Sequence, residues 1–291
     1  RHVIGKDSLS TKITYFIDDF VWDSKNLFKL MRPFQWVKNL LVFAPLFFAG
    51  ALYNKEYFIQ IFLAAIIFSV FSSVVYIFND IYDVEGDRKH PLKKNRPIAS
   101  NLVSVNKAIV FLGLLLFVGF ILIYFLPKIV PVILAYLFLN FIYTIWLKKV
   151  AIVDSISVSL CYVLRVIAGG LVISIYLSPW IILCVFFGSL FVVFGKRRSE
   201  FSRDNRRLVM EFYSEKGLDY AFVGSAIATL VIYAIWSVLG HNSPYLIYSN
   251  IFVCVVVFRL LNLIFMGSHY SEAPEILVFK DRVIFITFSF W

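Results

Sequence analysis

The sequence predicts an all-helical protein embedded in a membrane, a bundle of about nine transmembrane helices around a central cavity open to the cytoplasmic side. Of its 291 residues, 60% are hydrophobic and 19% aromatic, and the mean hydropathy is +0.83. A soluble domain is only about half apolar. Because the sequence shows no soluble domain boundary and no long linker, we expect a single transmembrane domain over residues 1–291.

Apolar runs long enough to cross a bilayer, which takes about 20 residues in a helix, predict the individual spans. They fall near residues 40–54, 57–78, 107–126, 129–147, 151–174, 179–195, 219–240 and 246–266. A ninth run, 283–291, is too short to span alone and predicts the start of an incomplete helix. Before the first span, apolar residues at helical spacing predict an interfacial amphipathic helix over residues 10–31.

The positions of the basic residues predict the orientation of the spans. Of the 28 Lys and Arg, all except Lys55, Lys128, Arg165 and Arg259 lie in the N-terminal segment, in the loops after every second span or near the C-terminus. The positive-inside rule places these regions in the cytoplasm. The net charge of +10 is then concentrated on one face, which favours anionic lipids or substrates as partners. Nucleic acid is not expected, because no soluble domain presents a surface for it.

Cysteine and histidine give no sign of a disulfide framework or of a zinc or haem site. Cys161, Cys184 and Cys254 all lie within apolar runs, where they are typical of small buried hydrophobic residues. The four histidines are scattered, and none is paired with a second His or Cys at a metal-ligand spacing.

An acidic motif, Asn79-Asp80-x-x-Asp83-x-x-x-Asp87, follows the second span and predicts a magnesium site. On a helix, this spacing places the three carboxylates on one face, where they repel one another. A bound divalent cation is the simplest compensation, and oxygen ligands favour Mg²⁺ that shares its coordination with a substrate phosphate. We expect all four residues to be metal ligands. The alternative is a solvated acidic helix end.

The loop after this motif is rich in basic residues that are suited to phosphate oxygens. Arg88, Lys89, Lys93 and Arg96 are predicted to bind the phosphates of a substrate, although ordinary positive-inside charge explains some of them. The prolines in this loop are expected to end helical structure, and Ser104 is a plausible N-cap for the third span.

A second group of polar residues surrounds the fifth span. Arg165 lies well inside it and is expected to face a cavity or a partner, because a charge within the membrane is costly. Asp154 is about three helical turns away, too far for a direct pair. A phosphate with its metal would serve both residues, and a structural pair for Arg165 is the alternative. The following Gly169 and Gly170 predict close approach of another helix.

Basic residues elsewhere complete the predicted site. Lys196 and Arg197 come closest to the membrane in the third basic loop, and Arg32, Gln35, Lys38 and Asn39 share one helical face before the first span. Lys38 and Asn39 would need a polar partner there, although a Lys near a helix end more often snorkels. The predicted catalytic residues are Asp80, Asp83 and Asp154. The predicted substrate-binding residues are Lys38, Tyr76, Arg88, Lys89, Lys93, Arg96, Lys148, Arg165, Lys196 and Arg197.

The acidic motif after the second span resembles the signature of the UbiA prenyltransferase superfamily. The resemblance implies an all-helical membrane protein that uses Mg²⁺ at this motif to bind a diphosphate. Most members transfer an isoprenyl group from its diphosphate and carry a second Asp-x-x-x-Asp motif. Here Asp154 is followed at the fourth position by Val158, so the second aspartate is missing.

Other segments are similar to one branch of that family, the decaprenyl-phosphate phosphoribosyltransferases. The similar segments lie at residues 32–39, 87–91, 96–99, 164–170, 195–200, 273–275 and 281–282. The resemblance implies phosphoribosyl pyrophosphate as donor, a polyprenyl phosphate as acceptor, diphosphate as the released product and Mg²⁺ as cofactor. It also implies a multi-pass protein of the bacterial inner membrane, possible homo-oligomers, and in mycobacteria-like organisms a role in arabinan synthesis for the cell wall.

Two other functions stay open at this point. One is a UbiA-type prenyltransferase that moves an isoprenyl group to a quinone precursor, haem or glycerol-lipid acceptor, for which a second aspartate pair is expected. The other is a transporter or channel, since charges within a membrane fit that class too. The acids and bases of this sequence cluster at one membrane face and do not follow a path across it, which favours the enzyme.

Overall fold

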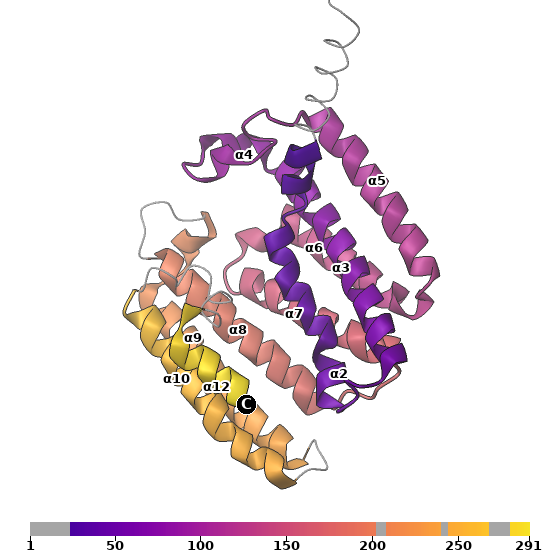
Figure 1. Ribbon diagram of the computed structural model, residues 1–291. Coiled ribbons are helices and arrows are strands. Elements are labelled where there is room, and N and C mark those ends of the chain that lie inside the picture. The colour runs from indigo at the N-terminus through magenta and orange to yellow at the C-terminus, as the bar shows by residue number, and fades with distance from the viewer. Residues whose placement is uncertain (1–23, 202–207, 240–243, 268–279) are drawn as a thin grey trace, which may run out of the picture. The chain divides into compact units, whose positions relative to one another are not determined.

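The computed structural model describes residues 24–201, 208–239, 244–267 and 280–291, and the regular structure of these residues is entirely helical (Figure 1). The chain forms two compact units. Unit 1 comprises Arg1–Asn39 and Ile66–Phe125, and unit 2 comprises Leu40–Ala65 and Leu126–Trp291. The chain therefore passes from one unit to the other within η1 (Pro33–Phe43) and again within α3 (Lys55–Tyr82).

Unit 1 contains the acidic motif and the first basic loop. It contains α4 (Val84–Lys89), η2 (Lys93–Asn95) and α5 (Val105–Tyr124). It also contains its parts of η1 and α3 and a helical segment at residues 24–30. Ser104 caps α5, because its hydroxyl accepts a hydrogen bond from the Lys107 N–H at 3.3 Å. The predicted N-cap is thus confirmed. α4 ends before Pro91, as expected for a residue that cannot continue a helix.

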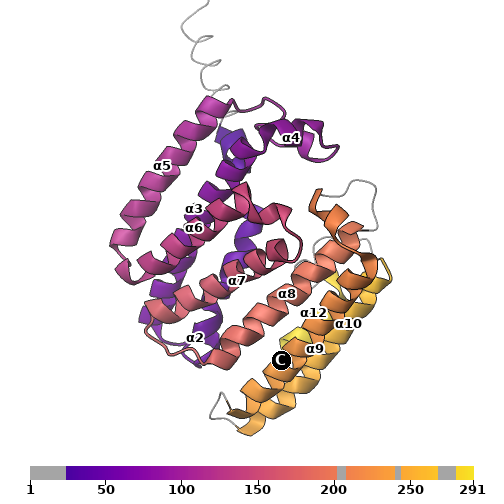
Figure 2. The same cartoon turned by 180° about the vertical axis from the view of Figure 1, so that it is seen from behind.

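Besides its parts of η1 and α3, unit 2 contains the other helices that the structure describes. They are α2 (Ala44–Phe48), η3 (Pro127–Ile129), α6 (Val130–Ile145), η4 (Leu147–Lys149), α7 (Val153–Val172), α8 (Pro179–Phe201), η5 (Leu208–Phe212), α9 (Glu215–Leu239), η6 (Pro244–Ser249), α10 (Asn250–Phe265) and α12 (Arg282–Phe290). α8 packs along α9, and α10 lies beside α9 and α12 (Figure 2). Phe191 of α8 stacks on Phe222 of α9 at the centre of this packing, with ring centroids 5.0 Å apart.

Seven helices in the described part of the chain are long and apolar enough to cross a membrane. They are Lys55–Tyr82, Val105–Tyr124, Pro127–Ile145, Val153–Val172, Pro179–Phe201, Glu215–Leu239 and Tyr245–Phe265. They coincide with the predicted spans from 57–78 onward, so the all-helical membrane architecture is confirmed. The full predicted count of nine is not.

The first predicted span, residues 40–54, is wrong as a single helix. The chain instead forms the 3-10 helix η1, then the short α2, and turns at Gly50 with φ +64. Pro45 explains the change at residue 44, because it lacks the N–H that a continuing helix would use and is suited to the first turn of a new helix.

The predicted close approach at Gly169 is confirmed within unit 2. A Cβ atom on Gly169 would lie 2.1 Å from the carbonyl oxygen of Val42 and 3.0 Å from the ring of Pro45. Since a side chain cannot fit there, glycine lets α7 pack directly against the backbone before α2.

The two ends of the predicted architecture are described in part. Residues 24–30 of the predicted helix over 10–31 are helical, and the preceding residues lie outside the described part of the chain. The ninth run forms α12, and Trp291 beyond it donates an indole hydrogen bond to the Tyr233 hydroxyl at 2.7 Å.

Candidate functional site

The acidic motif in unit 1 lies where α3 gives way to α4. Asp83 stands between the two helices with φ −94 and ψ 7, yet its N–H bonds to the Asn79 carbonyl at 2.9 Å and its carbonyl accepts from the Asp87 N–H at 2.8 Å. The chain therefore continues through a nearly helical turn. Asp80 and Asp87 are brought together on one side of it, with only 2% and 3% of their surfaces exposed.

Two arginines neutralise these two carboxylates. Nη1 of Arg96 lies 3.0 Å from Oδ1 of Asp80 and 2.5 Å from Oδ2 of Asp87, so a single nitrogen bridges both residues. Arg32 donates to the same Oδ1 of Asp80 and lies over the ring of Tyr76, 5.2 Å from its centroid. We call these four charged residues, Arg32, Asp80, Asp87 and Arg96, the acidic cluster. The repulsion for which the sequence suggested a metal ion is offset here by guanidinium groups.

The acidic cluster nevertheless fits a divalent cation by its chemistry. Two buried carboxylate oxygens from different residues converge on one positively charged atom, and Mg²⁺ is commonly bound by one or two carboxylates together with substrate phosphates. Among the residues that the structure describes, no group of three or more His, Cys, Asp or Glu side chains is arranged to hold a metal. The four predicted ligands are therefore not assembled as a set.

The other predicted residues of unit 1 have different surroundings. Arg88 bonds to Glu85 and to Asn101, each at 2.8 Å. Lys89 is exposed, whereas Lys93 and Lys38 are half-buried. Asn39 has the polar partners that its position required, because its amide donates to the hydroxyl groups of Ser69 and Ser72.

A second charged group, the Asp154 cluster, lies in unit 2 and consists of Asp154, Ser155, Arg197 and Tyr213. Asp154, in the first turn of α7, is fully buried. Its Oδ2 accepts from Nε of Arg197 at 2.9 Å and lies 2.8 Å from Nη2 of the same guanidinium. Its Oδ1 accepts from the Tyr213 hydroxyl at 2.6 Å and from Ser155 at 3.2 Å. Both oxygens of this carboxylate are thus occupied by protein donors.

This arrangement changes two expectations. Residues 195–201 belong to α8 and not to a loop, so Arg197 projects from a helix and is only 3% exposed. A helix that carries a charge this close to the membrane is stabilised because Asp154 neutralises it. Asp154 and Arg165 each have partners within the protein, so a shared phosphate with its metal is not needed to balance their charges.

Besides Ser155, which is next to Asp154 in the chain, Tyr213 is the member of the Asp154 cluster that sequence reasoning missed. It follows η5, and no motif links it to Asp154, which is 59 residues away in the chain. Besides donating to Asp154, its hydroxyl accepts from the N–H of Ile152 at 2.5 Å. Burial, together with the hydrogen bond to Asp154, raises the pKa of Tyr213 from 10.0 to about 12. Tyr213 therefore holds its proton as the donor to a buried carboxylate.

The hydroxyl of Tyr213 also holds a strained turn. Ile152 has φ +69 and ψ −48, a conformation that a β-branched residue rarely adopts. Such strain costs about 1–3 kcal/mol and persists only where the surroundings fix it. The hydrogen bond from the Ile152 N–H to the Tyr213 hydroxyl is one of the contacts that hold this conformation.

Arg165 is held in the middle of α7 by tyrosines. Its guanidinium lies 5.1 Å from the ring centroid of Tyr136 and 5.7 Å from that of Tyr162. It donates to the carbonyl of Cys161 at 2.7 Å and to the Tyr136 hydroxyl at 3.3 Å. Aromatic faces and carbonyl oxygens stabilise a cation away from water, so they account for this arginine inside a span. Lys148 and Lys196 are half-buried in the same unit.

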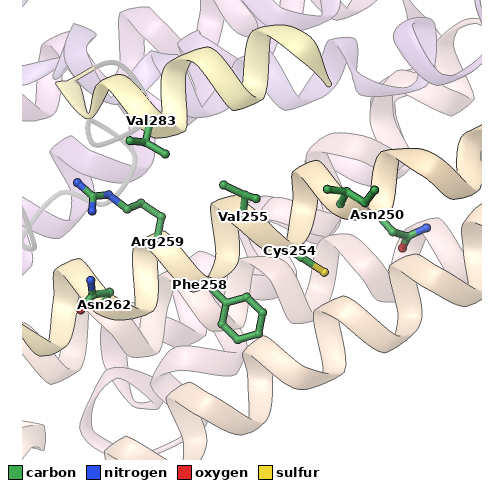
Figure 3. A pocket seen from close by; sticks show the side chains of 8 residues that line it. Asn250, Cys254, Val255, Phe258, Arg259, Asn262 and Val283 are labelled. Atoms are coloured by element: carbon green, nitrogen blue, oxygen red, sulfur yellow. The ribbon is translucent and has the colours of Figure 1, made fainter.

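A groove of about 620 Å³ runs between α10 and α12 (Figure 3). Val283 of α12 points toward α10, and Arg259 extends from α10 toward α12, where it bonds to Asp281 at 2.9 Å. The groove is lined mainly by apolar side chains and contains none of the predicted site residues. It shares no residue with either charged cluster.

The sequence match to a known family decides the assignment. The model of the UbiA prenyltransferase family matches residues 40–277. This chain belongs to the UbiA prenyltransferase family. The predicted resemblance to this family is thereby confirmed, and the matched residues include the acidic motif and the residues of the Asp154 cluster.

Curated relatives and solved structures agree with this assignment. A decaprenyl-phosphate phosphoribosyltransferase of Mycobacterium tuberculosis is 33% identical over 277 residues, covering 90% of the UbiA-family chain and 90% of the relative. A decaprenyl-phosphate phosphoribosyltransferase of Corynebacterium glutamicum is 31% identical, covering 91% of this chain and 84% of the relative. The structure of a UbiA homolog from Archaeoglobus fulgidus bound to GPP and Mg²⁺ has a TM-score of 0.70 and 16% identity, over 91% of this chain and 97% of that one. The last comparison shows the shared fold.

Proposed function

We propose that this protein transfers the 5-phosphoribosyl group of phosphoribosyl pyrophosphate to a polyprenyl phosphate of the decaprenyl type and releases diphosphate, with Mg²⁺ as cofactor. The observation that carries the proposal is the absence of a second acidic pair. Val158 replaces the second aspartate, and both oxygens of Asp154 are occupied by Arg197, Tyr213 and Ser155. The relatives that carry the phosphoribosyltransferase name support the choice of donor and acceptor.

The acidic cluster is the proposed donor site. Asp80 and Asp87, with Asn79 and Asp83 beside them in the chain, would hold Mg²⁺. The bound ion would neutralise charge on the departing diphosphate. Arg96 and other basic side chains would hold the phosphate oxygens by charge-assisted hydrogen bonds. In unit 1 the further proposed phosphate-binding residues are Lys38, Arg88, Lys89 and Lys93, and Tyr76 positions Arg32.

The transfer itself needs little chemistry from the protein. An oxygen of the acceptor phosphate forms the new bond to the anomeric carbon of the ribose, and the bond from that carbon to the diphosphate breaks. Because the acceptor is a phosphate monoester, already a dianion near neutral pH, no strong general base is required. The proposed side chains therefore act by positioning and by stabilising the charge that develops on the leaving group.

The residues of unit 2 take two kinds of proposed roles. Lys148, Arg165 and Lys196 are proposed to bind substrate. Asp154 is buried and bound by Arg197 and Tyr213, so we assign it a positioning role in place of the catalytic role predicted from the sequence. Arg197, whose guanidinium faces Asp154 and Glu200, is assigned the same role.

The proposed setting is a bacterial inner membrane with the active site facing the cytoplasm. The basic residues support this orientation through the positive-inside rule. The donor is a polar, soluble molecule and would reach the site from the cytoplasm, whereas the acceptor lipid would enter from the bilayer. A product of this type would serve as a precursor for cell-wall arabinan.

A radiochemical assay separates the proposal from its main alternative. Purified protein is incubated with Mg²⁺, polyprenyl phosphate and labelled phosphoribosyl pyrophosphate, and the label in the lipid fraction is measured. We expect labelled lipid, which EDTA abolishes. The alternative is an isoprenyl transferase, favoured by the 29% identity over 238 residues to a digeranylgeranylglyceryl phosphate synthase of Sulfurisphaera tokodaii. Product formed only with an isoprenyl diphosphate and a lipid or aromatic acceptor would establish that alternative.

A further inference from the structure

Arg96 bridges the two carboxylates that are proposed to bind the metal, and this position has a consequence for how the site is filled. We propose that Arg96 acts as a built-in counter-ion of the acidic cluster, which it leaves when the cluster takes up a divalent cation, and that the released guanidinium then binds the diphosphate. This inference rests on the proposed donor site. It makes uptake of the cation depend on the donor.

Arg96 lies between the two carboxylates, at the position that a bound cation would take. One nitrogen, Nη1, contacts oxygens of both Asp80 and Asp87, at 3.0 and 2.5 Å. The two carboxyl groups are almost fully buried, whereas the Arg96 side chain is 27% exposed. A buried carboxylate needs a positive partner. Because Arg96 is partly exposed, it is the member of this group that can move.

Charge balance shows why a cation cannot simply be added. Asp80 and Asp87 carry two negative charges, and Arg32 and Arg96 carry two positive charges, so the cluster is neutral as it stands. A divalent ion beside both guanidinium groups would be repelled at short range. If Arg96 withdraws from the carboxylates, the ion can replace it.

The withdrawn guanidinium needs a new anion, and the diphosphate of the donor supplies one. Arg96 has the planar fork of donors that suits phosphate oxygens. The cation and the diphosphate therefore assist each other: each is bound more tightly when the other is present, and by linkage the two enhancements are equal. Arg32 keeps one positive charge on Asp80 in both states.

The first test measures the binding of Mn²⁺, used in place of Mg²⁺ because its electron paramagnetic resonance signal reports the free ion. The substitution Arg96→Gln removes the competing charge, and Lys94→Gln removes the same charge from an exposed side chain in the same loop. Without any donor, we expect Arg96→Gln to bind Mn²⁺ at least about tenfold more tightly than the wild type, and Lys94→Gln to bind it as the wild type does. Equal affinities in the two variants would overturn the proposal.

The second measurement adds inorganic pyrophosphate as the probe for the diphosphate. Asp87→Asn removes one of the bridged carboxylates and serves as the control. The Mn²⁺ signal lost on adding pyrophosphate to this variant measures the Mn²⁺ that pyrophosphate binds in solution. We expect pyrophosphate to strengthen Mn²⁺ binding strongly in the wild type and only weakly in Arg96→Gln. An undiminished enhancement in the variant would contradict the proposed exchange. Because neither measurement requires group transfer, the exchange can stand even where the radiochemical assay gives no labelled lipid.

A chemical rescue guards against a variant that is merely misfolded. In Arg96→Ala, free guanidinium ion at low millimolar concentration is expected to occupy the vacated place and to compete with Mn²⁺. In the wild type the same concentration is expected to have no effect, since Arg96 already fills that place. Competition that is equal in both proteins, or absent from the variant, would refute the role of Arg96.

Discussion

Replacing Tyr213 by phenylalanine removes one hydroxyl group from the Asp154 cluster and leaves the ring in place. The hydroxyl donates to Oδ1 of Asp154 at 2.6 Å and accepts from the Ile152 N–H at 2.5 Å. In the variant the buried carboxylate loses its shortest donor, and a backbone N–H in a strained turn loses its acceptor. We therefore expect the folded state to be destabilised without a change in the apolar packing.

The magnitude follows from these two hydrogen bonds. A hydrogen bond to a charged group contributes about 1.5–3 kcal/mol, and a buried donor left without an acceptor costs about 1–3 kcal/mol. Ser155 and Arg197 still hold the Asp154 carboxylate, so the two losses are only partly additive. We expect the free energy of unfolding to fall by about 2–4 kcal/mol, and the apparent Tm to fall by about 2–4 °C for each kcal/mol.

Thermal unfolding in detergent measures this effect, and its pH dependence tests the cause. The pKa of Tyr213 is raised to about 12 from 10.0, so the folded state favours the neutral phenol. The stabilisation is complete below pH 10.0 and is lost as the pH rises toward 12. The difference between the wild type and Tyr213→Phe should shrink over that range. Tyr220→Phe, at a position 75% exposed, is the matched control. Equal Tm values for the two variants would refute the reasoning.

Three further substitutions test other parts of the structure. Asp83→Asn should lower turnover in the radiochemical assay by more than about 100-fold, since charge stabilisation at a reacting centre is worth that much, while the Tm stays near that of the wild type. Asp281→Asn keeps an N-cap but loses the ion pair with Arg259, and it should lower the Tm at pH 7. The hydrogen bonds from Arg259 and a backbone N–H outweigh burial and lower the pKa of Asp281 below 3.8, so this difference should fade as the pH falls below that value. Gly169→Ala should destabilise the protein by about 1–3 kcal/mol or more, because a Cβ there would meet a carbonyl oxygen at 2.1 Å.

Each of these substitutions has its own check. Near-normal turnover of Asp83→Asn would remove the case for a metal ligand at that position. A Tm difference for Asp281→Asn that persists at the lowest pH would show that the ion pair is not its cause. Gly224→Ala is the control for Gly169→Ala, because nothing lies within 4 Å of a Cβ at Gly224 and alanine favours a helix over glycine. Equal destabilisation by the two alanines would contradict the close packing of α7.

The sequence predicted the parts of the fold that depend on local chemistry. Apolar runs located the spans, the Ser104 hydroxyl marked the start of α5, and Gly169 marked a close helix contact. Each of these features follows from residues next to one another in the chain or from the absence of a side chain. The 3-10 helix η1 had no such signal, because 3-10 and α-helical turns suit the same residues.

The charge partners were the part that sequence reasoning did not supply. The acidic motif was recognised, but Arg32, which binds Asp80, lies 48 residues earlier in the chain. Arg197 was assigned to a substrate because its partner, Asp154, lies 43 residues away. A charge in a sequence shows that a partner is needed, and only the packing of the helices shows which partner it has. Buried aspartates near several arginines are therefore ambiguous until the fold is known.

The partners of α7 also bear on how this part of the protein enters the membrane. A charged residue at the centre of a helix raises the free energy of insertion by about 2.5–3.5 kcal/mol, and α7 carries Arg165 in its middle as well as Asp154 near its start. Tyr136, which holds Arg165, comes from the preceding α6, whereas Arg197 comes from the following α8. If α7 left the translocon alone, it would lack both Tyr136 and Arg197 as partners. Because these partners come from α6 and α8, we expect α7 to be more stable in the lipid once all three helices are present.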